Sequence, residues 1–252
     1  IGSNTGNNPP YYSRYNHSFS ETNFDLLFNV DKNISSDLNL KALLGGNIRK
    51  TNNQSIYAIT NGGLIIPGLF SLSNSVSAPA APLEVYQPSE VDGVFAGATL
   101  TFRKFLILDG TIRRDQSSTL PKGNNSYYYP SVSGGFVFSE LLKSVSWLSY
   151  GKLRANYATV GHSAPVFSTK DTYVIGSPFN GSATAFPNTY KNNSDLLPEK
   201  NESYEFGLEA NFLNSRLGFD LTYYHARTYT PIDLVQISNA SGYSSKRSEE
   251  RR

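Results

Sequence analysis

The sequence predicts an all-β protein, an antiparallel up-and-down sheet that forms a segment of a transmembrane β-barrel with long extracellular loops. Apolar and polar residues alternate with period two along several stretches, as in strands with one apolar and one polar face. The links between these stretches are alternately short and long, as in outer-membrane barrels. The composition is 13% aromatic and 17% charged, with 20 Gly and no Cys. This mixture suits strands joined by turns and polar loops.

Four predicted strands lie in the first half of the chain. Apolar residues recur at alternate positions in the first three of them, and the intervening residues are mostly polar. These apolar positions are Phe24, Leu26, Phe28 and Val30, then Leu38, Leu40, Ala42, Leu44 and Ile48, then Val94, Ala96, Ala98, Leu100 and Phe102. Residues 105–114 predict the fourth strand, in which a continuous apolar run adjoins the alternation.

The second half of the chain continues the pattern. Residues 131–138 predict a fifth strand, and residues 152–157, with Leu153, Ala155 and Tyr157 on one face, predict a sixth. Residues 202–212 and 216–226 alternate over their full length and predict two more strands. A ninth strand is expected to begin near Ile232, so the chain predicts about nine strands.

The lengths of the links predict how these strands are arranged. Short links alternate with long ones along the chain, which places tight turns at one end of the sheet and long loops at the other. The links are residues 31–36, 51–91, 103–104, 115–130, 139–149, 160–201 and 213–215. Trp147 lies in one of the short-end links, where it fits an interfacial aromatic belt or simple packing. A soluble sandwich with Greek-key crossovers need not show this alternation.

Charge and motif content argue against several functions. The formal net charge is +2, which gives no electrostatic basis for binding nucleic acid. The three histidines lack the spacing of a metal site, and nucleotide-binding and nucleophile-elbow motifs are missing from the sequence. We therefore predict no catalytic residue, no metal and no cofactor. The mixed-sign residues 244–252 predict an irregular charged tail after a barrel domain at 1–243.

Two candidate sites stand out. Arg113, Arg114 and Asp115 end the fourth predicted strand, where it leaves the barrel wall for a long link. Alternation places the two arginines on opposite faces, so that one points to the lumen and pairs with an acid while the other meets the rim. We favour a structural ion cluster over a ligand contact here.

Aromatic residues of the long links form the second candidate site. Aromatic faces stack on sugars, and tyrosine hydroxyls bond to peptides. We predict ligand contacts at Tyr127, Tyr128, Tyr129, Tyr173 and Phe179. An interfacial girdle or loop packing is the alternative for the three consecutive tyrosines.

Several short motifs follow one another in a fixed order. They are GGLIIPGLFSLSNS at 62–75, R-x-D-x-S-S at 113–118, Y-P-S-V at 129–132, K-L-R-A-x-Y-A-x-V-G at 152–161 and L-x-P-E-x-x-x-S-x-E-x-G-L-E at 196–209. Together they resemble the SusC/RagA family of TonB-dependent outer-membrane transporters, over most of residues 20–243.

This resemblance implies a 22-stranded barrel in the bacterial outer membrane, surrounded by lipid and closed by an N-terminal plug. It implies import of oligosaccharides or peptides with a SusD-like lipoprotein as a lid and a TonB complex as the energy source. About nine strands are only part of such a barrel, so we expect a fragment that is inactive alone. A soluble β-sandwich that binds carbohydrate is the alternative, and dependence on detergent distinguishes the two.

Overall fold

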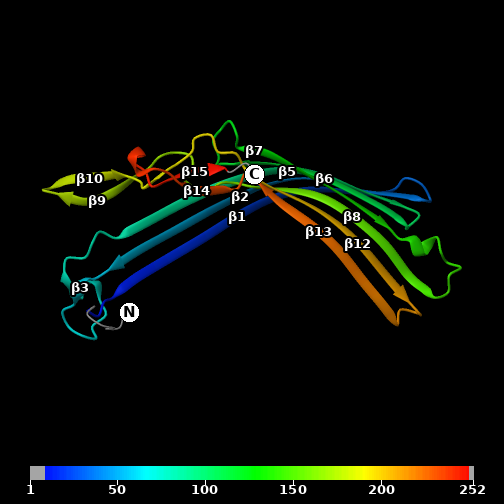
Figure 1. Cartoon of the computed structure of the whole chain (residues 1–252), viewed down its shortest axis with the longest axis horizontal. Coiled ribbons are helices and arrows are strands. Elements are labelled where there is room, and N and C mark those ends of the chain that lie inside the picture. The colour runs from blue at the N-terminus through cyan, green and yellow to red at the C-terminus, as the bar shows by residue number, and fades with distance from the viewer. Residues whose placement is uncertain (1–8, 250–252) are drawn as a thin grey trace.

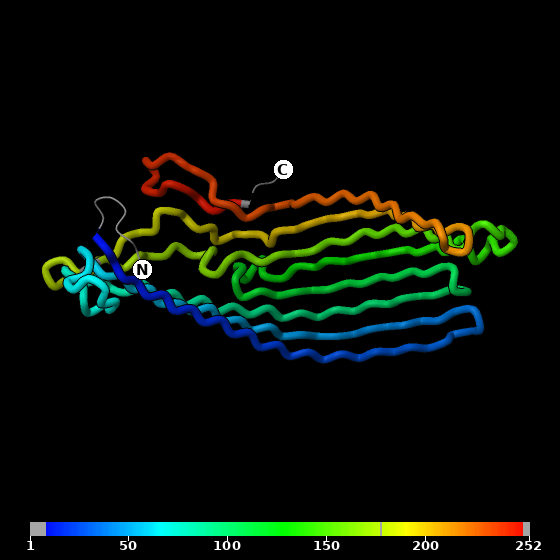
Figure 2. The backbone as a smooth tube through the Cα atoms, turned by 90° about the horizontal axis from the view of Figure 1, so that it is seen from below, coloured from blue at the N-terminus to red at the C-terminus, as the bar shows by residue number. Residues whose placement is uncertain are grey.

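The computed structural model describes residues 9–249 as an all-β protein built around one antiparallel sheet. Eight strands follow one another through this sheet in chain order, and each pairs only with its sequence neighbours in the sheet (Figure 2). They are β1 (Ser13–Asn33), β2 (Leu38–Ile59), β5 (Leu83–Phe102), β6 (Leu106–Ser117), β7 (Ser126–Phe136), β8 (Leu148–His162), β12 (Glu199–Phe212) and β13 (Leu217–Tyr229). The predicted up-and-down antiparallel topology is confirmed.

The connections alternate as predicted except in the middle of the sheet. There the link at 118–125, which lies at the long-loop end, is shorter than the link at 137–147, which lies at the short-turn end. Short links lie at one end of the sheet, and the two longest loops lie together at the other end, as Figure 2 shows at right and left. Each of the two longest loops contains a short two-stranded sheet. One is formed by β3 (Asn61–Leu64) and β4 (Ser75–Ser77), and the other by β9 (Tyr173–Phe179) and β10 (Ser182–Pro187). Three short 3-10 turns span Leu72–Asn74, Phe138–Glu140 and Asn239–Ser241. No helix within residues 9–249 is long and apolar enough to cross a membrane.

The ninth predicted strand forms outside the main sheet. β14 (Ile232–Gln236) pairs with β15 (Ser245–Glu249), which in turn pairs with β11 (Tyr190–Lys191). The expectation of an irregular tail is therefore wrong for residues 245–249, and residues 250–252 lie outside the described residues. The guanidinium of Arg247 lies 5.7 Å from the Tyr190 ring centroid, and its Nε donates to Asn192 Oδ1 over 3.3 Å. Such tertiary contacts order a segment that its composition alone would leave irregular.

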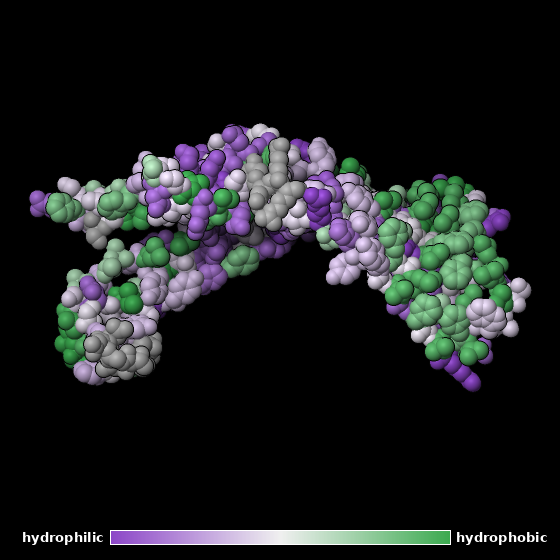
Figure 3. All heavy atoms as spheres, in the orientation of Figure 1, coloured by the Kyte–Doolittle hydropathy of each residue, from purple (hydrophilic) through white to green (hydrophobic). Residues whose placement is uncertain are grey.

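The main sheet has one apolar and one polar face. Directly opposed residues share a face, and the register aligns Val30, Ala42, Ala98, Gly110 and Val132 across five strands. The side chains on this apolar face are strongly exposed, with Leu26 at 63% and Leu221 at 66%. Figure 3 shows apolar side chains gathered over the arm that carries β12 and β13. We call this stripe, which runs along the part of each strand near the short turns, the apolar band.

No central hydrophobic core supports the described part of the sheet. The buried apolar cluster comprises Leu120, Ala164 and Leu196, with Tyr127 and Ile232 packed against it. It lies mainly in the long loops and at their junction with the sheet. A wall between lipid on one face and water on the other needs no core of its own, because lipid covers its apolar side chains.

β1 (21 residues) and β2 (22 residues) are much longer than the stretches of alternation predicted. Their outer parts, residues 13–23 and 50–59, are mostly polar, and scattered apolar residues such as Phe19 and Ile56 do not recur with period two, so alternation cannot detect them. A strand of 21 residues is about 70 Å long at about 3.3 Å per residue. The hydrocarbon core of a bilayer is about 30 Å thick. The outer parts of β1, β2 and β5 therefore project beyond the apolar band, as the long left arms in Figure 1 show.

Candidate functional site

An ion-pair cluster lies on the polar face where β6 approaches its long loop. Arg113 Nε lies 2.7 Å from Asp115 Oδ1, and Arg113 Nη2 donates to Asn47 Oδ1 over 2.7 Å. The Tyr129 hydroxyl donates to the other Asp115 oxygen, Oδ2. Asp115 is only 6% exposed. We call Asn47, Arg113, Asp115 and Tyr129 the β6 cluster.

A glycine on the neighbouring strand makes room for this cluster. Gly93 on β5 opposes Asp115 in the register. A Cβ at Gly93 would lie 2.4 Å from Arg113 Nη2, 2.5 Å from Asn47 Oδ1 and 2.6 Å from Asp115 Oδ1. Each distance is well below van der Waals contact, so a side chain at this position would displace at least one member of the cluster.

Arg114 lies on the opposite face, as alternation predicts. Its Nη2 donates to Ser126 Oγ over 2.9 Å, and its guanidinium lies 6.0 Å from the Tyr128 ring centroid. The structure thus brings Arg113 and Asp115 together and separates Arg114 from them. The Arg113–Asp115 pair is largely buried, because the Asp115 side chain is 9% exposed and that of Arg113 is 29% exposed. Removing one partner of a buried pair costs more than breaking an exposed one, because the remaining charge has lost its solvation.

The predicted ligand aromatics do not form one site. Tyr127, Tyr128 and Tyr129 lie in β7, whereas the sequence analysis assigned them to a loop. Tyr127 and Tyr129 stack with ring centroids 5.9 Å apart on the polar face, while Tyr128 points to the apolar face. Polar Asn and Ser residues before the tyrosines concealed the strand start. β7 begins there because β6 supplies its backbone partners.

Tyr173 and Phe179 are separate from the tyrosine pair. They lie at the two ends of β9 in the long loop between β8 and β12, and are 70% and 77% exposed. Among the described residues, neither ring stacks on another aromatic side chain. They are free to contact a partner or a ligand that approaches the loop end of the sheet.

The sequence analysis assigned no role to a second cluster on the polar face, around Arg154 of β8. Arg154 Nη2 lies 2.7 Å from Asp220 Oδ1 on β13, and Arg154 Nε lies 3.9 Å from Glu205 Oε1 on β12. A Cβ at Gly207, on the strand between them, would lie 2.3 Å from Arg154 Nε. The sequence contained a sign of this cluster, because Arg154 and Gly207 belong to the motifs at 152–161 and 196–209. Their pairing requires the register of three strands.

The two clusters have the same construction and the same chemical consequence. In each, an arginine ties adjacent strands together on the polar face, and a glycine leaves space for it. Each arginine is neutralised within its cluster: Arg113 with Asp115 is neutral overall, and Arg154 with Glu205 and Asp220 leaves a net charge of −1. No group of three or more potential metal ligands occurs within residues 9–249.

Comparison with known proteins gives a consistent result. The family described as "TonB dependent receptor-like, beta-barrel" matches residues 2–248. The TonB-dependent receptor P26 of Formosa agariphila is 25% identical over 222 residues, which cover 84% of this chain and 22% of that protein. The TonB-dependent receptor SusC of Bacteroides thetaiotaomicron is 28% identical over 147 residues, which cover 54% of this chain and 14% of SusC.

The fold also matches solved structures. The RagAB peptide transporter superposes with a TM-score of 0.81 at 23% identity, covering 94% of this chain and 27% of that chain. The RagAB peptide importer in its open-open state gives a TM-score of 0.77 at 22% identity. The chain thus spans between 14% and 27% of the length of these relatives and of the RagAB transporter chain.

Proposed function

Since the chain belongs to the TonB dependent receptor-like, beta-barrel family, we propose that it forms one sector of the wall of an outer-membrane importer. The observation that carries this proposal is the two-faced sheet. Its apolar face is exposed along the band, and its polar face holds fully paired charges such as Arg113 with Asp115. Lipid on one side and a water-filled lumen on the other satisfy both faces at once.

The first and last strands of the main sheet indicate that it is part of a larger barrel. β1 and β13 each have one unpaired edge in the main sheet. Hydrocarbon provides no hydrogen-bond partners for such edges, so only a closed barrel satisfies them in a membrane. We propose that further strands of the same protein complete the wall, to the 22 strands that the family resemblance implies. The sector alone then transports nothing.

We propose oligosaccharides or peptides as the cargo, with a SusD-like lipoprotein as the outer lid and a TonB complex as the energy source. The SusC relative and the fold match to a peptide transporter named RagAB support this class of machine. Tyr173 and Phe179 are exposed at the loop end, where a lid or incoming ligand would arrive. Tyr127 and Tyr129 face the proposed lumen near the same end.

A soluble carbohydrate-binding sandwich fits less well. Such a fold buries the apolar face of one sheet against a second sheet. Here Leu26 and Leu221 remain about two-thirds exposed, and no second large sheet covers them within residues 9–249.

Uptake by the full-length protein tests the proposal. The gene is deleted from its host and restored, and cells are supplied with fluorescent pools of oligosaccharides or oligopeptides. We expect uptake of one pool to require the gene, a working TonB complex and a co-purifying lipoprotein. Uptake of both pools that is independent of the gene, together with a monomer soluble in plain buffer, would overturn the proposal.

A further inference from the structure

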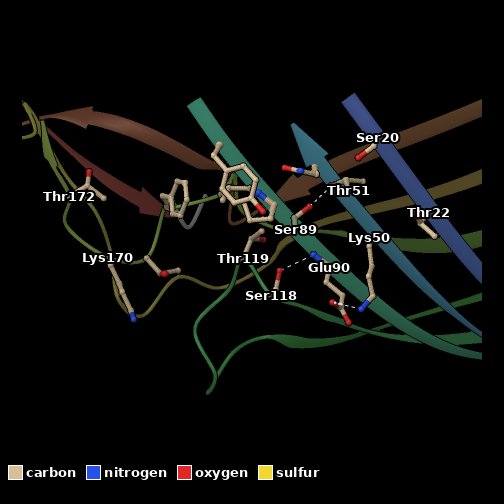
Figure 4. A pocket seen from close by; sticks show the side chains of 16 residues that line it. Ser20, Thr22, Lys50, Thr51, Ser89, Glu90, Ser118, Thr119, Lys170 and Thr172 are labelled. Atoms are coloured by element: carbon tan, nitrogen blue, oxygen red, sulfur yellow. Dashed lines mark hydrogen bonds and ion pairs between the residues drawn. The ribbon is translucent and has the colours of Figure 1, made fainter. Parts of the chain in front are cut away.

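A cleft of about 570 Å³ lies between the projecting parts of β1, β2 and β5 and the loop after β8 (Figure 4). One wall carries Thr22, Lys50 and Glu90, and the loop wall includes Phe167 and Lys170. It lies apart from the β6 cluster and the Arg154 cluster, and no role assigned so far uses it.

The cleft opens on the face of the main sheet that carries the apolar band. The register aligns Thr22 with Lys50 and Lys50 with Glu90, so these three side chains share one face. Two residues further along the same face, Phe24 and Ile48 begin the apolar band. The cleft floor therefore lies about 7 Å above the band, at about 3.3 Å per residue. This is the height of lipid headgroups, on the side facing away from the lumen.

The loop wall is held in place by a buried asparagine. Asn192, only 5% exposed, donates from Nδ2 to the carbonyl oxygens of Phe167 and Lys170 over 2.9 and 2.7 Å. Its backbone N–H donates to Asp171 Oδ1 over 2.9 Å. These bonds fix residues 167–171, so the cleft is formed before any ligand arrives.

Polar atoms at the cleft lack partners among the described residues. Asn52 lines the cleft, and its Oδ1 is buried without a hydrogen bond. Ser168 does not line the cleft, but it lies next to Phe167 in the same loop, is 1% exposed, and its Oγ is also unpaired. Buried polar atoms are nearly always bonded in folded proteins. A ligand that supplies hydrogen-bond donors to Asn52 would remove this cost.

The lining chemistry selects the ligand. Hydroxyl groups predominate around the cleft, and Tyr86 and Phe167 contribute aromatic rings. Lys50 and Glu90 pair at 3.1 Å, so two lysines against one glutamate leave a net charge of +1. Sugars offer many hydroxyl donors and acceptors together with a C–H face that packs on aromatic rings. A phospholipid headgroup offers mainly charge and would select several basic residues.

We propose that this cleft binds the sugar headgroup of a glycolipid in the outer leaflet. Asn52 and the surrounding hydroxyls recognise the sugar, and the acyl chains lie along the apolar band below it. The inference rests on the membrane placement in the proposed function and on no property of the transport path. It gives the outer face of the wall a specific lipid contact.

Photo-crosslinking in the full-length transporter tests the proposal in its native membrane. p-Benzoylphenylalanine replaces Tyr86 in the cleft or, as a matched control, Gln87, the next residue on the opposite face. We expect a glycolipid adduct by mass spectrometry at position 86 and none at position 87. Equal adducts at both positions, or none at position 86, would overturn the proposal.

Retention of glycolipid provides a second measurement. We expect Asn52→Ala to lower the glycolipid retained in native mass spectra about tenfold, the effect of one buried hydrogen bond. Asn53→Ala, whose side chain lies on the opposite face, should retain it. Equal retention by both variants contradicts the proposal, as does binding of free oligosaccharide but not glycolipid in phospholipid nanodiscs. If either of these contrary results is found while uptake is normal, the glycolipid proposal fails and the proposed function stands. If uptake fails while the glycolipid adduct at position 86 still forms, only the proposed function is contradicted.

Discussion

Replacement of Gly93 by alanine tests whether the β6 cluster stabilises the wall. The added Cβ would lie within 2.4–2.6 Å of Arg113, Asn47 and Asp115 atoms, so the cluster must open. The Arg113 guanidinium can move, but only by giving up its bond to Asn47 or to Asp115. Asp115 keeps the hydrogen bond from Tyr129, so the loss is that of one partner of a buried group, about 1–3 kcal/mol.

Urea unfolding of the full-length barrel in detergent measures this change, with the free energy of unfolding as the readout. Gly110→Ala is the matched control, because a Cβ at Gly110 on the adjacent strand meets nothing within 4 Å. We expect Gly93→Ala to unfold at lower urea than the parent protein and Gly110→Ala to match the parent. If the two variants unfold at the same urea concentration, the cluster does not stabilise the wall.

Three further predictions concern the wall and its turns. Asp115→Ala should lower the yield of folded barrel, measured by heat-dependent gel mobility, more than ligand affinity; a larger loss of affinity would favour a ligand contact. Lys104→Gly should raise the free energy of unfolding by about 0.5–1 kcal/mol, because Lys104 has a φ of +61° in the β5–β6 turn; an unchanged urea midpoint would contradict this. Leu221→Arg on the apolar face should cost about 2–4 kcal/mol, whereas Tyr224→Arg on the polar face should cost little. Equal losses in urea unfolding would refute the assignment of the two faces.

The sequence alone predicted the strands well wherever one face of the sheet is apolar and the other is polar. The alternation at Phe24, Leu26 and Phe28 fixed a strand and its face because only one side of the strand there is apolar. The outer half of the same strand, around His17, is mostly polar and exposed, so no alternation marks it. Tyr127–Tyr129 were misplaced for a related reason, since polar neighbours resemble a loop until the pairing with β6 is known.

Site geometry was predictable only within one strand. Arg113 and Asp115 are two residues apart, so period two alone places them on one face. Arg154 and Asp220 are 66 residues apart, and their contact depends on the register of β8, β12 and β13. Neither motif spacing nor composition contains that register.

The absence of a core in the described sheet explains where recognition can occur. In the proposed barrel, lipid and water cover the two faces, and the strands are tied together by backbone bonds and by polar-face clusters such as those of Arg113 and Arg154. Each arginine in them is already neutralised and held against a glycine, so it cannot turn toward a ligand without loosening the wall. Groups with free hydrogen-bonding or stacking capacity therefore lie beyond the band, at Asn52 in the cleft and at Tyr173 and Phe179 on the long loop. In the proposed importer, the part of each long strand within the apolar band thus maintains the shape of the barrel, and the projecting part makes contacts.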